Sequence, residues 1–257
     1  MTFPLESLTQ MQSFFWVLMR VGIIIFLLPL FGARGVPVLW KIGLSMILAI
    51  VMMPLVPAAV RYPETAPEII ISFASEAIMG FILALTMRMF FTSVQMAGSF
   101  ISFQIGFSMA KAMDPQAEVQ DSVLTEFLYI LTILFFFTMD GHHMFIRALA
   151  SSFQIVPPNA ITFDSSIGGI LVKLSGEMFL VGVKLSAPLI LALFLSNLCL
   201  GIIARTVPQV NILMVGFPVN LVVGFIFLIM VIGNMNPFVT QLFKKMGEAL
   251  TGLIRLM

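Results

Sequence analysis

Three features of the sequence predict an all-α, membrane-associated fold: the composition, the length of the apolar segments, and the breaks between them. Of the 257 residues, 60% are hydrophobic and 10% are charged, and the mean hydropathy is +1.10. A soluble domain carries about 25% charged residues, whereas a helix that faces lipid can be apolar on every side. Water is therefore excluded as the main solvent of this chain.

Six segments are apolar for long enough to form membrane helices, since roughly 20 residues span a hydrocarbon core about 30 Å thick. In chain order they are Ser13–Phe31, Val38–Val56, Ile69–Phe91, Val123–Met139, Met178–Ile203 and Ile212–Ile232. Proline or glycine lies in the breaks between them, as helix ends require. We expect one domain over residues 1–257, in which some segments are buried in protein and do not span lipid.

Two further stretches do not fit a simple count of spans. Residues 92–121 are apolar but contain glycines, glutamines and a lysine and end in acidic residues, which predicts a helix that breaks into a loop. Residues 239–256 alternate apolar and charged positions at helical spacing, which predicts an amphipathic C-terminal helix. Such a helix could lie on lipid headgroups or dock on a partner, and the sequence leaves both open.

Charged side chains inside the apolar segments need partners, because each costs about 2.5–3.5 kcal/mol to insert at membrane depth. We expect buried contacts, between helices or between subunits, for Arg20, Glu76, Arg88, Lys173, Glu177, Lys184 and Arg205. Glu76 and Arg88 lie about 18 Å apart along one helix, so each needs a partner on another helix. Lys173, Glu177 and Lys184 fall within about 40° on a helical wheel and form one polar stripe. Packing ion pairs, ion relay and subunit contact all remain open as roles.

Small residues supply a second packing signal. Gly98 with Gly106, and Gly216 with Gly224, recur at two-turn spacing, which allows helix backbones to approach closely. Orientation stays open, because the lysines and arginines of the connecting segments divide almost equally between the two sides of the membrane.

One run, Asp140-Gly141-His142-His143, has the residue types of a metal site. Zinc usually needs three or four protein ligands, and adjacent side chains on a helix diverge by about 100°, so we predict a helix boundary there and no metal site. Phosphate-binding and nucleophile-elbow motifs are absent from the sequence. We therefore expect no enzyme and no cofactor. The net charge of +1 gives no reason to expect a nucleic-acid partner.

An ordered set of short motifs along the chain resembles the FliR family of flagellar export-gate proteins, which is related to the SctT proteins of virulence injectisomes. The motifs are Arg20-Val21-Gly22, Pro29 to Gly32, Val36-Pro37, Glu76 with Gly80 and Phe81, Gly98 with Ile101, Gln104 and Gly106, Asp114-Pro115, Asp140 to His143, Ala187-Pro188, Gly201 to Arg205, Pro208 to Asn211, and Gly216 to Pro218. The resemblance covers about residues 14–238. It implies a fold of long, membrane-associated helical hairpins, some of whose segments are buried in a subunit assembly and do not span lipid.

The resemblance implies a non-enzymatic, pore-forming subunit of the flagellar type III export gate in the bacterial inner membrane, at the flagellar basal body. It further implies FliP-like and FliQ-like gate subunits as partners, FlhB-like and FlhA-like export proteins nearby, and unfolded flagellar subunits as substrates. An injectisome gate subunit is the first alternative, and an autonomous secondary transporter or channel is the second.

With the resemblance as background, residues 106–121 become a candidate channel plug. Its proposed residues are Gly106, Phe107, Met109, Met113, Asp114 and Pro115. Flexible methionine side chains can seal around varied substrates and repack when a chain displaces them. The alternative is an ordinary loop between two helices.

Overall fold

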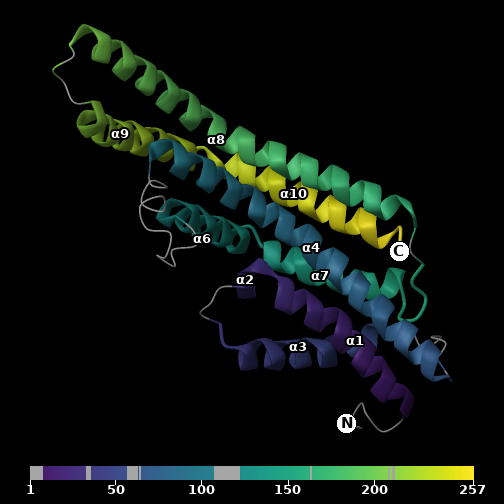
Figure 1. The fold of residues 1–257 in the computed structure, drawn as a ribbon. Coiled ribbons are helices and arrows are strands. Elements are labelled where there is room, and N and C mark those ends of the chain that lie inside the picture. Colours follow the sequence, from purple (N-terminus) through teal and green to yellow (C-terminus); the bar gives the residue numbers. More distant parts are fainter. Residues whose placement is uncertain are drawn as a thin grey trace. The chain divides into compact units, whose positions relative to one another are not determined.

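The computed structural model describes residues 8–32, 36–56, 63, 65–106, 122–162, 164–207, 209 and 212–257 (Figure 1). Every regular element within these residues is a helix, which confirms the predicted all-α class. The chain divides into two compact units, one of residues 1–89, 140–174 and 243–257, the other of residues 90–139 and 175–242. Three helices, α4, α8 and α10, continue from one unit into the other.

The first unit begins with α1 (Leu8–Leu27), a short α2 (Pro29–Gly32), α3 (Val38–Met52) and the 3₁₀ turn η1 (Met53–Leu55). It also contains α4 (Ala66–Ile105) as far as Met89, α7 (Gly141–Ile155), the first turns of α8 (Ser166–Thr206) and the end of α10 (Met235–Ile254). Helix α1 packs against α3 and contributes much of the core, including Trp16, which is 1% exposed.

The second unit contains the rest of α4, α6 (Val123–Thr138), most of α8, α9 (Ile212–Gly233) and the start of α10. Helix α4 approaches its neighbours closely here: a Cβ built on Gly98 would lie 2.8 Å from the Cα of Thr125 on α6, and one on Gly224 would lie 2.7 Å from Ile105. Phe91 and Phe136 meet edge to face with ring centroids 5.5 Å apart. Gly98 and Gly224 therefore make the close helix contacts that their spacing indicates.

Helix α4 extends well beyond the predicted segment. It continues to Ile105, so the polar residues between Thr92 and Ile105 lie on a helix, which ends within the stretch 92–121 where a break is predicted. Gly106 ends the helix with φ of +99°, a left-handed conformation that glycine adopts without the steric cost of a Cβ. Gly106 thus terminates α4, a different use from the close packing expected of it.

Helix α7 is absent from the predicted segments, and α8 begins twelve residues before Met178. A run with Phe145, Leu149 and Phe153 buried at four-residue spacing forms the apolar face of α7. Its exposed positions mix polar residues, His143, Arg147 and Gln154, with Ile146 and Ile155, so the helix is less uniformly apolar than the predicted membrane segments. Asp140, which precedes it, has φ 55° and ψ 27°, a left-handed conformation.

The expectation that the C-terminal helix lies on headgroups or docks on a partner is wrong for its apolar face. Along α10 that face is buried within the chain itself, at Met235, Val239, Leu242, Phe243, Met246, Leu250, Leu253 and Ile254. What α10 offers outward is its polar face, which includes Lys244, Lys245 and Glu248.

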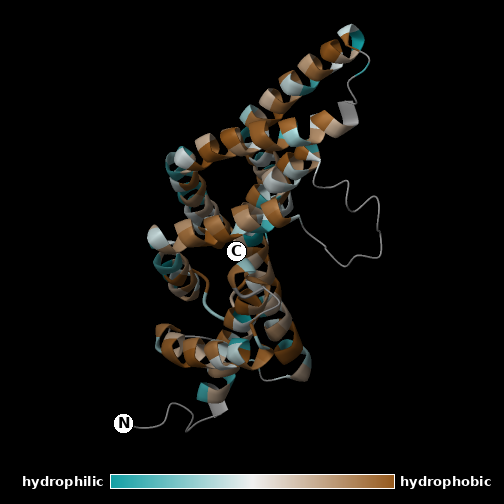
Figure 2. Cartoon of the chain, turned by 90° about the vertical axis from the view of Figure 1, so that its left-hand side faces the viewer, coloured by the Kyte–Doolittle hydropathy of each residue, from teal (hydrophilic) through white to brown (hydrophobic). Residues whose placement is uncertain are grey.

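By length and composition, five described helices could each cross a membrane: α1, α3 with η1, α4, α8 and α9. The bent pair α6 and α7 would make a sixth if it counts as one span. Figure 2 shows hydrophobic residues along most of the ribbon, with short hydrophilic stretches between them. In the apolar windows of α8 and α9 only 11% of the residues are buried, against 44% in α4, so most of the apolar side chains in these two windows are at least partly exposed.

Candidate functional site

Two of the predicted polar residues meet in the core of the first unit. Arg20 on α1 and Glu76 on α4 are both 0% exposed and form a two-pronged ion pair. The Nε of Arg20 donates to Oε2 of Glu76 at 2.7 Å, and one terminal nitrogen donates to Oε1 at 3.1 Å. This parallel geometry is the strongest form of an arginine–carboxylate contact.

The rest of the guanidinium is held by the C-terminal end of α7. Its other terminal nitrogen donates to the carbonyl oxygen of Ser152 at 3.0 Å and to the Ser152 hydroxyl at 3.2 Å. Both terminal nitrogens donate to the carbonyl oxygen of Val156 at 3.2 Å. The guanidinium also lies over the ring of Phe153, 4.4 Å from its centroid. Arg20 therefore fixes the relative register of α1, α4 and α7.

Gly80 explains how α1 comes close enough for this pair. It lies one turn after Glu76, and a Cβ built on it would be 2.9 Å from the carbonyl oxygen of Arg20. Any side chain at this position would push the two backbones apart and lengthen the ion pair. In this motif Glu76 supplies the carboxylate that binds Arg20, and Gly80 allows the backbones of α1 and α4 to come close enough for that contact.

The structure leaves the other predicted polar residues on the outside of the chain. Arg88, Lys173, Lys184 and Arg205 are exposed, and Glu177 is half-buried. Within the described residues none of them has a hydrogen-bond or ion-pair partner for its side chain. Lys173, Glu177 and Lys184 do share α8, as the stripe requires. Contacts for these residues inside this chain are therefore not observed, and contacts with another subunit remain a proposal.

A polar cluster that is not among the predicted contacts lies in the second unit, between α8 and α9. Ser196 donates to the side-chain oxygen of Asn220 at 3.0 Å, and the amide nitrogen of Asn220 donates to the side-chain oxygen of Asn197 at 2.7 Å. These bonds join α8 to α9, a helix in which Asn220 is the one polar side chain. Asparagine is rare in such segments, and its presence was the available signal.

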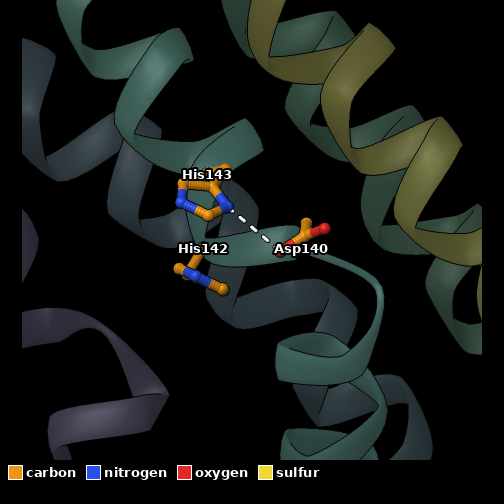
Figure 3. A group of neighbouring side chains, drawn as sticks. All are labelled: Asp140, His142 and His143. Carbon is orange, nitrogen blue, oxygen red and sulfur yellow. Dashed lines mark hydrogen bonds and ion pairs between the residues drawn. The ribbon is translucent and has the colours of Figure 1, made fainter.

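The Asp140-Gly141-His142-His143 run caps the start of α7 (Figure 3). Oδ1 of Asp140 and Nδ1 of His143 lie 3.1 Å apart, and the two imidazole rings are 4.2 Å apart at their centroids. One ligand atom from each of Asp140, His142 and His143 lies within 4.8 Å of the other two. The rings thus converge more closely than a divergence of 100° on an ideal helix indicates.

Beside this run the first unit has a cavity of about 950 Å³ between α7 and α10. Asp140, His143 and Arg147 line it from α7 and the preceding turn, and Glu248 and Arg255 line it from α10. Two carboxylates face two guanidinium groups, so the formal charges balance. A second, almost wholly apolar cavity of about 340 Å³ lies between α1 and α3.

Most of the proposed plug lies outside the described residues. Phe107, Met109, Met113, Asp114 and Pro115 all fall in that part, and only Gly106, at the end of α4, is described. The plug therefore remains a proposal.

Comparison with known proteins identifies the family. Residues 11–246 match the model of "Bacterial export proteins, family 1". The chain is 33% identical over 249 residues to the flagellar biosynthetic protein FliR of Bacillus subtilis (strain 168), with 95% of each chain covered. It is 31% identical over 249 residues to the protein of the same name from Escherichia coli (strain K12), covering 97% of this chain and 95% of that one. The chain therefore belongs to the bacterial export proteins of family 1 and, within them, to the FliR family.

Proposed function

We propose that this chain is a non-enzymatic, pore-forming subunit of the flagellar type III export gate, which passes unfolded flagellar subunits across the bacterial inner membrane. The observation that carries the proposal is the extent of the similarity, which covers 95% or more of this chain in relatives named as flagellar biosynthetic proteins. The same naming favours the flagellar gate over the injectisome gate.

The exposed apolar surface of α8 and α9 supports a role inside an assembly. Several large apolar side chains on these helices are about half exposed or more: Leu191, Phe194, Leu198, Phe225 and Ile229. Exposed apolar side chains in such number require lipid or protein cover. The polar residues of α8, Lys173, Glu177 and Lys184, favour protein over lipid along part of that helix. FliP-like and FliQ-like subunits are the proposed cover, with FlhB-like and FlhA-like proteins near the same assembly.

An autonomous transporter is the second candidate, suggested by charges within apolar segments. Arg20 and Glu76 argue against it, because they neutralise each other in a fully buried pair and line neither of the two cavities described above. A proton or ion pathway would need such groups to face water or substrate.

The test is complementation in a flagellate bacterium that lacks its own FliR protein. Expression of this chain is expected to restore swimming and the export of hook and filament proteins, and mild-detergent purification is expected to recover it with other gate subunits. An empty vector is the control. Failure of export, together with a lone monodisperse chain that transports a small solute in vesicles, would contradict the proposal.

The plug is tested separately by deleting residues 107–120 in the assembled gate and measuring ion leakage. The proposal expects a larger resting leak in the deletion than in the intact gate. An equal leak would contradict the plug while leaving the gate assignment intact.

A further inference from the structure

The two histidines of this chain are adjacent, and both lie in the first turn of α7. Asp140 precedes them by two residues and contributes a carboxylate to the same turn (Figure 3). The sequence has one cysteine, Cys199, which lies on α8 in the other unit. All of the imidazole nitrogens that could bind a metal are therefore gathered in one place.

The spacing of the three groups is near that of a metal centre. Zinc binds imidazole nitrogen and carboxylate oxygen at about 2.0–2.2 Å, so neighbouring ligand atoms of a tetrahedral site lie roughly 3.3 Å apart. Nδ1 of His143 and Oδ1 of Asp140 are already 3.1 Å apart, and the three ligand atoms all lie within 4.8 Å of one another. The side chains of His143 and Asp140 are 60% and 75% exposed, so rotations about their χ angles can close the remaining gap without moving the backbone.

The backbone of Asp140 directs its carboxylate toward the histidines. Its φ of 55° is left-handed, a conformation that aspartate tolerates better than most residues. Asp140 stands at the N-cap position of α7, so its carboxylate adds a negative charge near the positive end of the helix dipole. Without this carboxylate a cation would meet two imidazoles at the positive end of the helix dipole, with no negative charge beside them.

The donor set selects the class of ion. Two imidazoles with one carboxylate suit zinc, cobalt, nickel and copper, whereas calcium and magnesium prefer oxygen ligands throughout. Asp140 and His143 also line the 950 Å³ cavity, so water or an added ligand can occupy the remaining coordination positions from that side. We propose that Asp140, His142 and His143 form a binding site for one divalent transition-metal ion of the zinc type.

The site can be tested on the full chain, purified in detergent without a histidine tag and stripped with a chelator. Zinc is then titrated against a chromophoric chelator, and copper is added for electron paramagnetic resonance. We expect one zinc ion per chain, and a copper spectrum with hyperfine splitting from imidazole nitrogen. The copper measurement uses the unmodified chain, so it does not depend on whether a variant folds.

Three variants assign the ligands. His142→Ala and His143→Ala are each expected to weaken zinc binding at least tenfold, and Asp140→Asn, which keeps the left-handed backbone, is expected to weaken it as well. Cys199→Ser, on α8 in the other unit, is the control and is expected to bind as the parent does. Absence of stoichiometric zinc binding, or binding that neither histidine variant alters, would overturn the proposal.

Discussion

Replacing Arg20 with methionine tests whether the buried ion pair of Arg20 and Glu76 stabilises the first unit. The substitution keeps the volume and apolar stem of the side chain but removes every donor of the guanidinium. Glu76 is then a carboxylate with 0% exposure and no cation, and removing one partner of a buried pair costs about 3–5 kcal/mol. The carbonyl oxygen of Ser152 still accepts a bond from the Val156 amide at 3.0 Å, so the expected loss comes from Glu76 and from the carbonyl oxygen of Val156, which loses two donors.

Glu76→Gln is expected to be milder. Glutamine retains one oxygen that can accept from Arg20, and the guanidinium keeps its bonds to the two carbonyl oxygens of Ser152 and Val156. A loss of about 1–3 kcal/mol is expected, typical of a weakened buried hydrogen bond to a charged group. The double variant should lose less than the sum of the single ones, with a coupling above about 1 kcal/mol.

The assay is unfolding by sodium dodecyl sulfate in mixed micelles, followed by tryptophan fluorescence. The chain has two tryptophans, and a Trp40→Phe background leaves the buried Trp16, close in sequence to Arg20, as the reporter. Arg88→Met is the matched control, because Arg88 is an exposed arginine on α4, the helix that carries Glu76. This substitution is expected to change the free energy of unfolding by no more than about 0.5 kcal/mol. The reasoning is refuted if Arg20→Met unfolds within about 1 kcal/mol of the control, or if the cycle shows no coupling.

Three further predictions concern packing, pH and the polar cluster. Gly98→Ala should lower stability by about 1–3 kcal/mol in the same assay, because its Cβ would lie 2.8 Å from the backbone of Thr125, while Gly201→Ala, with open space around it, should not. Asp164 accepts a hydrogen bond from the backbone N–H of Ser166 at 2.7 Å, which lowers the pKa of its carboxyl. The stabilising effect of the Asp164 carboxylate should be present above the ordinary aspartate pKa of about 3.9 and be lost as the pH falls through the lower pKa of the folded state. In thermal melting, Asp164→Asn should therefore be less stable than the parent at pH 7 but not at pH 2. Asn220→Leu should cost about 1 kcal/mol in vesicles, because it breaks both bonds between α8 and α9, and an unchanged melting temperature would contradict this.

The sequence predicts the apolar helices well because their signal is local. A run of about 20 apolar residues has few alternatives to a helix in lipid, and each of the six predicted segments overlaps a helix of the structure: α1, α3, α4, α6, α8 or α9. The need for a partner on another helix at Glu76 likewise follows from the cost of a buried charge.

What the sequence does not predict depends on distant contacts. Nothing local to Arg20 identifies Glu76 or the end of α7 as its neighbours, since they lie 56 and more than 130 residues away. Helix α7 itself is short and amphipathic, and a search for uniformly apolar segments passes over it. The convergence of His142 and His143 depends on side-chain rotamers in the first turn, which an ideal helical wheel does not represent.

The contacts of Arg20 also determine how early in translation the core of the first unit can form. Ser152 follows Arg20 by 132 residues, so at about 5–20 residues per second the ribosome needs roughly 7–26 s to supply this acceptor after Arg20 has been made. During that interval the first apolar helix carries a cation whose native contacts on α7 have not yet been synthesised. The first unit therefore completes its core late in translation. In a nascent chain arrested before α7, helix α1 should be less stably packed than in the finished protein.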